Sequence, residues 1–200
     1  MVWRRLGALV LLGLCLAGCA ADNKWAPDEV VDRYRYRHSG PPELALITVL
    51  NRSSGNGAHT ALMISGSERV IFDPAGSFSH PRVPERHDVL FGVTPAAEAG
   101  FLDFHARETY DVTVQRLEVP AATAELALSL ARANGPVRQA QCTTMTARLL
   151  SKLPGFESIR TTWFPDNLRR DFGKLPGVRE EFIRDDDPDV KSLDHVEVLQ

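Results

Sequence analysis

The chain has 200 residues, which suits one domain with a sizeable core, and its formal net charge is −3 at pH 7. A mildly acidic chain without a basic stripe argues against a nucleic-acid partner, because nothing in it would neutralise the phosphates. No internal repeat or low-complexity segment interrupts the sequence.

Residues 1–18 have the layout of a bacterial secretion signal. Two arginines precede an apolar run at residues 6–17, which is too short to be a stable membrane span. The run leads into Leu-Ala-Gly-Cys and resembles the lipobox of bacterial lipoproteins, in which the signal is removed before the cysteine. The resemblance implies a lipid, such as palmitate, on Cys19 and attachment to a membrane. Ala20 follows instead of Asp, which favours the outer membrane, facing the periplasm. The alternative is an ordinary signal peptide with a chance cysteine.

The chain has three cysteines. Cys15 lies in the signal and Cys19 is the expected lipid site, so Cys142 is the one thiol left and cannot form an intramolecular disulfide. It must be a small buried side chain, an intermolecular link or a reactive group. The count alone favours burial over catalysis.

Residues 19–42 are predicted to be a lipidated tether. Arginine and tyrosine alternate at residues 33–37, which is typical of a solvated linker or an edge strand. Contact with anionic lipid headgroups is an alternative for this stretch. The next segment, residues 43–50, is an apolar run that predicts a core strand. Residues 51–57 form a loop by composition.

Two short apolar segments at residues 60–64 and 69–72 flank the turn sequence Ser-Gly-Ser-Glu, which predicts a β-hairpin. A turn centred near Gly66 places Asp73 opposite His59, close enough for the side chains to pair. A register shift of one residue would send them to opposite faces of the sheet. An imidazole beside a carboxylate is the base and the orienting group that a thiol nucleophile requires.

The segment after the hairpin, residues 76–119, is predicted to contain a loop, two strands and a helix. Residues 76–88 contain several prolines and predict an irregular loop, and residues 89–93 predict a short strand. A helix is expected from residue 95 to about residue 105, with Thr94 as its cap and proline at its first position. Residues 110–119 alternate apolar and polar side chains, the pattern of a half-buried strand.

Two further helices are predicted. The first covers residues 121–133 and is ended by Asn-Gly-Pro. The second starts near Cys142 and runs to residue 153 before Pro-Gly. The free N–H groups and the dipole of a helix N-terminus lower the pKa of a thiol there. The position of Cys142 therefore favours catalysis over burial.

The C-terminal part is more polar. Residues 165–172 predict a short surface helix. Residues 178–200 are expected to be an acidic tail, with a solvated turn at residues 185–188 and a candidate edge strand at residues 196–199. The acidic turn lacks the alternating ligands and the distal Glu of a Ca²⁺ loop.

The three reactive side chains occur in the order His59, Asp73, Cys142. Papain-like proteins use the same parts, but with the cysteine helix first. The reversed order resembles the circularly permuted branch of the NlpC/P60 superfamily, which includes lecithin-retinol-acyltransferase-like and YiiX-like proteins. The matching motifs are G-A-H-T-A-L-M-I, R-V-I-F-D-P-A-G and Q-C-T-T-M-T-A-R-L-L.

The resemblance implies an α+β, papain-like fold over residues 43–177, with an antiparallel sheet packed against helices. Cys142 would attack a carbonyl carbon, His59 would take and return the proton, and Asp73 would orient the imidazole. The backbone N–H of Cys142 would help to hold the oxyanion.

Two positions stay open at this point. The second oxyanion donor is Gln139 or Gln141, since nothing in the spacing chooses between them. Thr60 is an alternative to Asp73 as the third member of the triad, although its side chain points to the other face from His59.

The expected function is a lipid-anchored cysteine hydrolase of the cell envelope. By the resemblance its substrates are peptidoglycan peptides, or esters and amides of acyl lipids, and no cofactor is expected. The alternative is a non-catalytic lipoprotein that binds a peptide or protein partner in the same groove. A metal site on His80, His87 and His105 is disfavoured because they form no closely spaced ligand pair, so no metal ion is expected.

Overall fold

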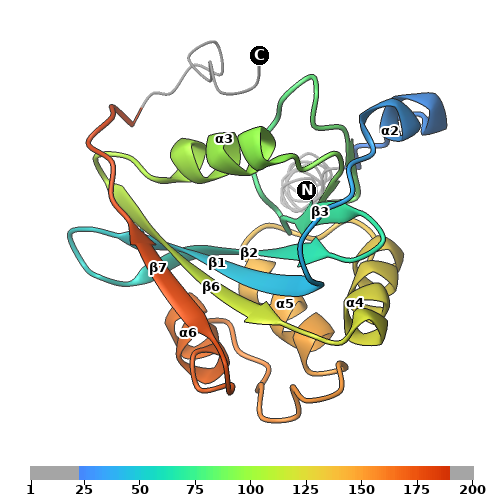
Figure 1. The fold of residues 1–200 in the computed structure, drawn as a ribbon. Helices are drawn as coiled ribbons and strands as arrows, with labels where there is room; N and C mark the ends of the chain where they lie inside the picture. Colours follow the sequence, from blue (N-terminus) through green and yellow to red (C-terminus); the bar gives the residue numbers. More distant parts are fainter. Residues whose placement is uncertain (1–22, 190–200) are drawn as a thin grey trace, which may run out of the picture.

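The computed structural model describes residues 23–189 (Figure 1). The predicted signal at residues 1–18, the predicted lipid site Cys19 and the candidate strand at residues 196–199 lie outside this part of the chain. Within it, no helix has the length and apolar character needed to cross a membrane.

A seven-stranded antiparallel sheet forms the centre of the fold. Its strands are β1 (Glu43–Asn51), β2 (Gly57–Ser65), β3 (Arg69–Phe72), β4 (Glu85–Arg86), β5 (Val89–Leu90), β6 (Tyr110–Glu118) and β7 (Arg179–Ile183). Their order across the sheet is β4-β5-β3-β2-β1-β6-β7. The sheet and its helices make a mixed α/β domain.

Helices cover both faces of the sheet. The described residues contain α2 (Asp28–Tyr34), α3 (Pro95–His105), α4 (Ala121–Ala133), α5 (Cys142–Leu150) and α6 (Pro165–Phe172). In Figure 1, α3 lies over one face, and α4, α5 and α6 lie over the other.

The apolar residues of β1 show why both faces are covered. Leu44 and Leu46 join the core under α4, α5 and α6, whereas Ala45 and Ile47 join the core under α3. Successive side chains of a strand point to opposite faces, so a continuous apolar run needs a layer on each side. Both cores are built from residues 26–183. A chain of residues 20–200 therefore keeps the whole described core and is expected to fold by itself.

The predicted hairpin is present, with a different register. The pairing of β2 with β3 centres the turn on Ser67 instead of Gly66. The Ser67 hydroxyl donates to the Glu125 carboxylate on α4 at 2.9 Å, which holds the turn in place. If the strands are extended in this register past the last observed pair, Asp73 lies two residues away from the position opposite His59. Because the shift is an even number, both side chains stay on the same face.

Helices with clear end signals match the prediction. The bounds of α3, α4 and α6 agree with the sequence, and the Thr94 hydroxyl accepts a hydrogen bond from the Ala97 N–H, as expected for a cap. The Cys142 helix ends earlier than expected, at Leu150. The next three residues form a tight turn in which the Leu153 N–H donates to the Leu150 carbonyl at 2.9 Å. Pro154 disfavours the helical conformation at Leu153, so the α-helix does not run through that residue.

The structure adds elements at both ends of the domain. The segment predicted as a tether contains α2, whose Val31 is buried in the core. The predicted loop at residues 76–88 contains β4. The sheet also continues past residue 177, because β7 pairs with β6 in the segment predicted as a tail. These elements are short and polar, so they carry little hydrophobic periodicity.

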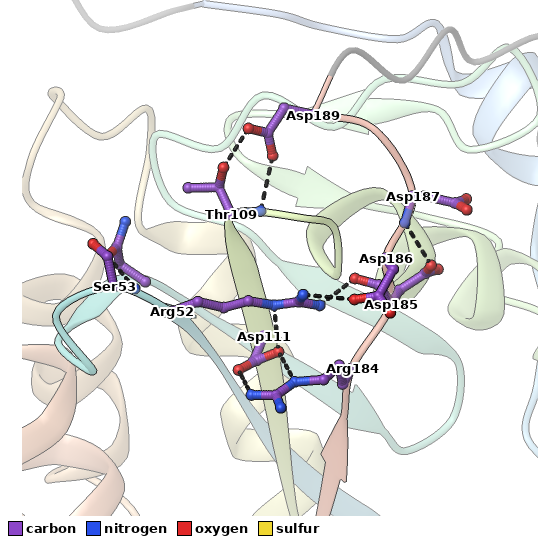
Figure 2. Close-up of polar contacts among 10 residues, drawn as sticks. Arg52, Ser53, Thr109, Asp111, Arg184, Asp185, Asp186, Asp187 and Asp189 are labelled. Carbon is purple, nitrogen blue, oxygen red and sulfur yellow. Dashed lines mark hydrogen bonds and ion pairs between the residues drawn. The ribbon is translucent and has the colours of Figure 1, made fainter.

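The acidic segment after β7 is tied to the domain by ion pairs (Figure 2). Arg52, from the β1–β2 loop, donates to Asp111 on β6 and to Asp186, each at 2.8 Å. Arg184 donates to both carboxylate oxygens of Asp111, at 3.0 and 2.8 Å. This part of the predicted solvated turn is therefore attached to the loop and the strand beside it.

Candidate active site

Cys142 is the first residue of α5 and is half-buried, with a free thiol. No side chain caps α5, so the backbone N–H groups of its first turn remain directed toward the end of the helix at which Cys142 lies. Ala140 has a φ of 63°, a left-handed conformation that turns the chain into the helix. The thiol therefore lies in the field of the helix N-terminus, as the sequence predicted.

A β-bulge positions His59. β2 pairs Val49 with His59 and Leu50 with Gly57, which leaves Ala58 as an extra residue between the pairs. A bulge bends its strand and redirects the neighbouring side chains. The His59 ring is thereby placed at the N-terminus of α5 and beside the end of β3.

Asp73 follows β3 and is 3% exposed. Its Oδ1 lies 2.6 Å from Nε2 of His59. Because a carboxylate accepts, the His59 Nε2 carries the proton, which leaves Nδ1 as the ring nitrogen for Cys142. A Cβ added to Gly76 would lie 1.9 Å from Asp73 Oδ2, so only glycine allows this close packing.

The electrostatics couple the three groups. Burial alone would lower the pKa of His59, but the Asp73 charge, its hydrogen bond and Cys142 raise that pKa to about 10. Burial would raise the pKa of the Cys142 thiol, but hydrogen bonds from His59, Thr143 and the Thr60 N–H, with the His59 charge, lower it. Burial opposes ionisation of Asp73, but its pairing with His59 lowers its pKa. The lowered pKa of the Cys142 thiol and the raised pKa of His59 both favour a thiolate beside an imidazolium over the neutral pair.

His105, at the end of α3, is a fourth group at the site. Its ring stacks on that of His59, with centroids 5.7 Å apart and planes 8° apart. Burial lowers the pKa of His105 to about 4, helped by the charges of His59 and Arg107 and opposed by Asp73, so the ring is neutral at pH 7. From the sequence, His105 was a candidate only as a metal ligand, because the contact between α3 and β2 has no local pattern.

Asp88 ties the two halves of the site together and was not predicted. Its carboxylate accepts from the Ala75 N–H at 3.0 Å, next to the Asp73 turn. It also accepts from the Val137 N–H at 2.6 Å, in the segment that leads to Cys142. No motif marks such a long-range carboxylate–backbone contact in the sequence.

A cavity of about 260 Å³ opens beside the triad. His59, Cys142, His105 and Gln139 line it, whereas Gln141 does not and is the N-cap residue of α5. Of the two predicted oxyanion donors, Gln139 therefore has access to the cavity. A cavity of about 440 Å³ near α2 has no cysteine, serine or threonine in its lining.

Three candidates from the sequence do not have the predicted roles. The hydroxyl of Thr60 bonds that of Thr143 at 3.1 Å, so it does not orient His59. His87 packs against Trp25, with ring centroids 4.8 Å apart, and His80 accepts from the Arg82 N–H.

Two clusters of the described residues have the chemistry of metal ligands. One consists of His59, Asp73 and His105, with one ligand atom of each within 4.8 Å of the others. The other consists of Asp103, Asp185 and Asp187, which are only partly buried or exposed. The first cluster departs from the sequence-based expectation, because it combines residues of β2, α3 and the end of β3.

Comparison with known proteins gives no match: no family model matches the chain, and no curated protein or solved structure matches it significantly.

Proposed function

We propose that this protein is a cysteine hydrolase that cleaves an amide or ester bond. The observation that carries the proposal is that Asp73 holds Nε2 of His59 at 2.6 Å, while His59 and Cys142 line the same cavity. A nucleophile, its base and an orienting group gathered at one site are the signature of covalent acyl transfer.

The reaction would proceed in two acyl transfers. The Cys142 thiolate bonds to the carbonyl carbon, and the carbonyl electron pair moves to oxygen. His59 gives its Nδ1 proton to the leaving nitrogen or oxygen as that bond breaks, which leaves a thioester. Water then attacks the thioester while His59 takes a proton from it, and Cys142 leaves as the thiolate. Asp73 remains ionised and holds the ring throughout.

The oxyanion of each step needs hydrogen-bond donors. The N–H of Cys142 at the start of α5 is one donor, and the Gln139 amide, which lines the cavity, is the second. This choice assigns Gln139 instead of Gln141 to the role. Removal of one such donor typically lowers kcat by about 100-fold or more.

The chain order and the layering support a permuted papain-like architecture of the NlpC/P60 type. His59 comes from β2 and Asp73 from the end of the neighbouring strand β3. Cys142 comes later in the chain, from helix α5, which packs on β2. With the predicted lipid on Cys19, the enzyme would act at the envelope membrane, on peptidoglycan peptides or on acyl lipids.

An exposed aromatic pair favours a substrate with an apolar group. Trp163 and Phe164 are 59% and 65% exposed. Their segment is attached to α5 two residues after Cys142, because the Thr144 hydroxyl donates to the Thr162 carbonyl at 3.2 Å. Exposed neighbouring aromatics at a site commonly mark contact with apolar ligand surface.

Turnover of activated esters tests the proposal. Residues 20–200 are incubated with 4-nitrophenyl esters from acetyl to decanoyl, and both nitrophenol release and protein mass are followed. We expect turnover, an acyl adduct on Cys142, and loss of both in Cys142→Ala. An inert wild-type protein that nevertheless binds peptide or protein would instead support the non-catalytic lipoprotein.

A further inference from the structure

The proposed hydrolysis leaves the buried imidazole of His105 without a role. His105 is 5% exposed and packs against Phe101 and Phe104, with ring centroids at 4.4 and 5.1 Å. Its Nδ1 lies 2.8 Å from the Phe101 carbonyl oxygen, which can only accept. The proton is therefore on Nδ1, and Nε2 carries a free lone pair.

The position of this lone pair matters because of its neighbours. One ligand atom each of His105, His59 and Asp73 lie within 4.8 Å of one another. Two imidazoles and one carboxylate are a common ligand set for Zn²⁺. Metal-bound histidines usually donate their other N–H to a carbonyl or a carboxylate, as His105 already does.

We propose that His59, Asp73 and His105 form a Zn²⁺ site whose occupation stops the hydrolase. Binding replaces the Nε2 proton of His59, which is released to solvent, and takes the Asp73 oxygen that held it. His59 keeps its Nδ1 proton, but giving it to the leaving group would turn the neutral ring into an anionic imidazolate, so the ring is a far weaker acid than the imidazolium. The first acyl transfer is then blocked where the leaving group needs its proton, and no thioester forms for the second.

The metal site and the inhibition can be tested separately. Zinc chloride is titrated by calorimetry into residues 20–200 at neutral pH in a non-chelating reductant. We expect one Zn²⁺ per chain in the wild type and in Cys142→Ser. His105→Phe keeps the aromatic packing but lacks the ligand, so its affinity should fall by about 100-fold or more. His87→Phe, which changes a histidine away from the site, should bind as the wild type does.

Inhibition is then measured as the ratio of ester turnover with and without one equivalent of Zn²⁺, within each variant. The ratio should fall in the wild type and His87→Phe and stay near one in His105→Phe. If His105→Phe does not fold, as judged by circular dichroism, His105→Gln replaces it.

Three results would overturn the proposal: no Zn²⁺ binding, equal affinity in His105→Phe, or loss of binding in Cys142→Ser. Loss of binding in Cys142→Ser would mean that the Cys142 thiolate binds the metal. The inhibitory consequence rests on the proposed function. However, Cys142→Ser has no thiol, so its titration tests the metal site even if the protein hydrolyses nothing.

Discussion

At the scale of single residues, the orientation of His59 depends on how closely Gly76 lets the backbone approach Asp73. A Cβ at Gly76 would lie 1.9 Å from Asp73 Oδ2, so Gly76→Ala must displace the carboxylate. We expect kcat/KM for esters to fall by about 100-fold, the typical effect of a misplaced catalytic group. The control is Gly135→Ala, which strains a backbone with a φ of +71° but adds a Cβ that meets no atom within 4 Å and so displaces no side chain. Equal activity of the two variants would contradict the role of Asp73.

Single residues also show what the sequence could predict of the site. Cys142 was predicted from its place at a helix start. His59 and Asp73 were predicted to be neighbours from the hairpin. The observed register differs from the predicted one by an even number of residues, so both side chains still lie on the same face of the sheet. His105 and Asp88 could not be predicted in their roles. Each acts through a contact between elements that are distant in sequence, and such contacts leave no local pattern.

At the scale of elements, the segment between α5 and α6 should contribute to substrate binding. Trp163→Ala combined with Phe164→Ala removes the exposed pair without touching the triad. We expect a higher KM for decanoyl esters and no change for acetyl esters, because only the long chain reaches the aromatic pair. The control is Phe182→Ala on β7, where the side chain is 54% exposed. The same KM increase for both esters would contradict this assignment.

Elements with clear end signals and hydrophobic periodicity could be predicted from the sequence, and elements without them could not. Helices α3, α4 and α6 were predicted with their bounds, because proline at or just before the first helical position marked where each begins. By contrast, α2 buries a single apolar side chain, Val31, and β7 is exposed over most of its length. Elements that bury so little have no pattern to detect, although pairing and packing still form them.

At the scale of the whole molecule, Asp111 joins the β1–β2 loop, β6 and the segment after β7. Hydrogen bonds from Arg184 lower the pKa of Asp111, burial opposes them, and the Arg52 and Arg184 charges add to the lowering (Figure 2). A lowered pKa in the folded state means that the carboxylate stabilises the fold above its unfolded pKa of about 3.9 and loses this effect as pH falls further.

Asp111→Asn should therefore lower the free energy of unfolding at pH 7 by about 1–3 kcal/mol, the usual range for hydrogen bonds to charged groups. The difference from the wild type should shrink below about pH 4, as measured by urea unfolding. Asp186→Asn is the matched control, because Asp186 is 88% exposed and pairs with the same Arg52, so its effect should stay below about 1 kcal/mol. A difference at pH 7 that persists unchanged at pH 3 would refute the charge-based explanation.

The measurement that tests the central claim most directly is the pH dependence of iodoacetamide alkylation of residues 20–200, in which Cys142 is the single thiol. We predict rapid alkylation well below the ordinary thiol pKa of about 8.5, and a shift of the profile to higher pH in His59→Ala. Slow alkylation of Cys142 at every pH, unaffected by His59→Ala, would contradict the Cys142–His59 pair and with it the hydrolase.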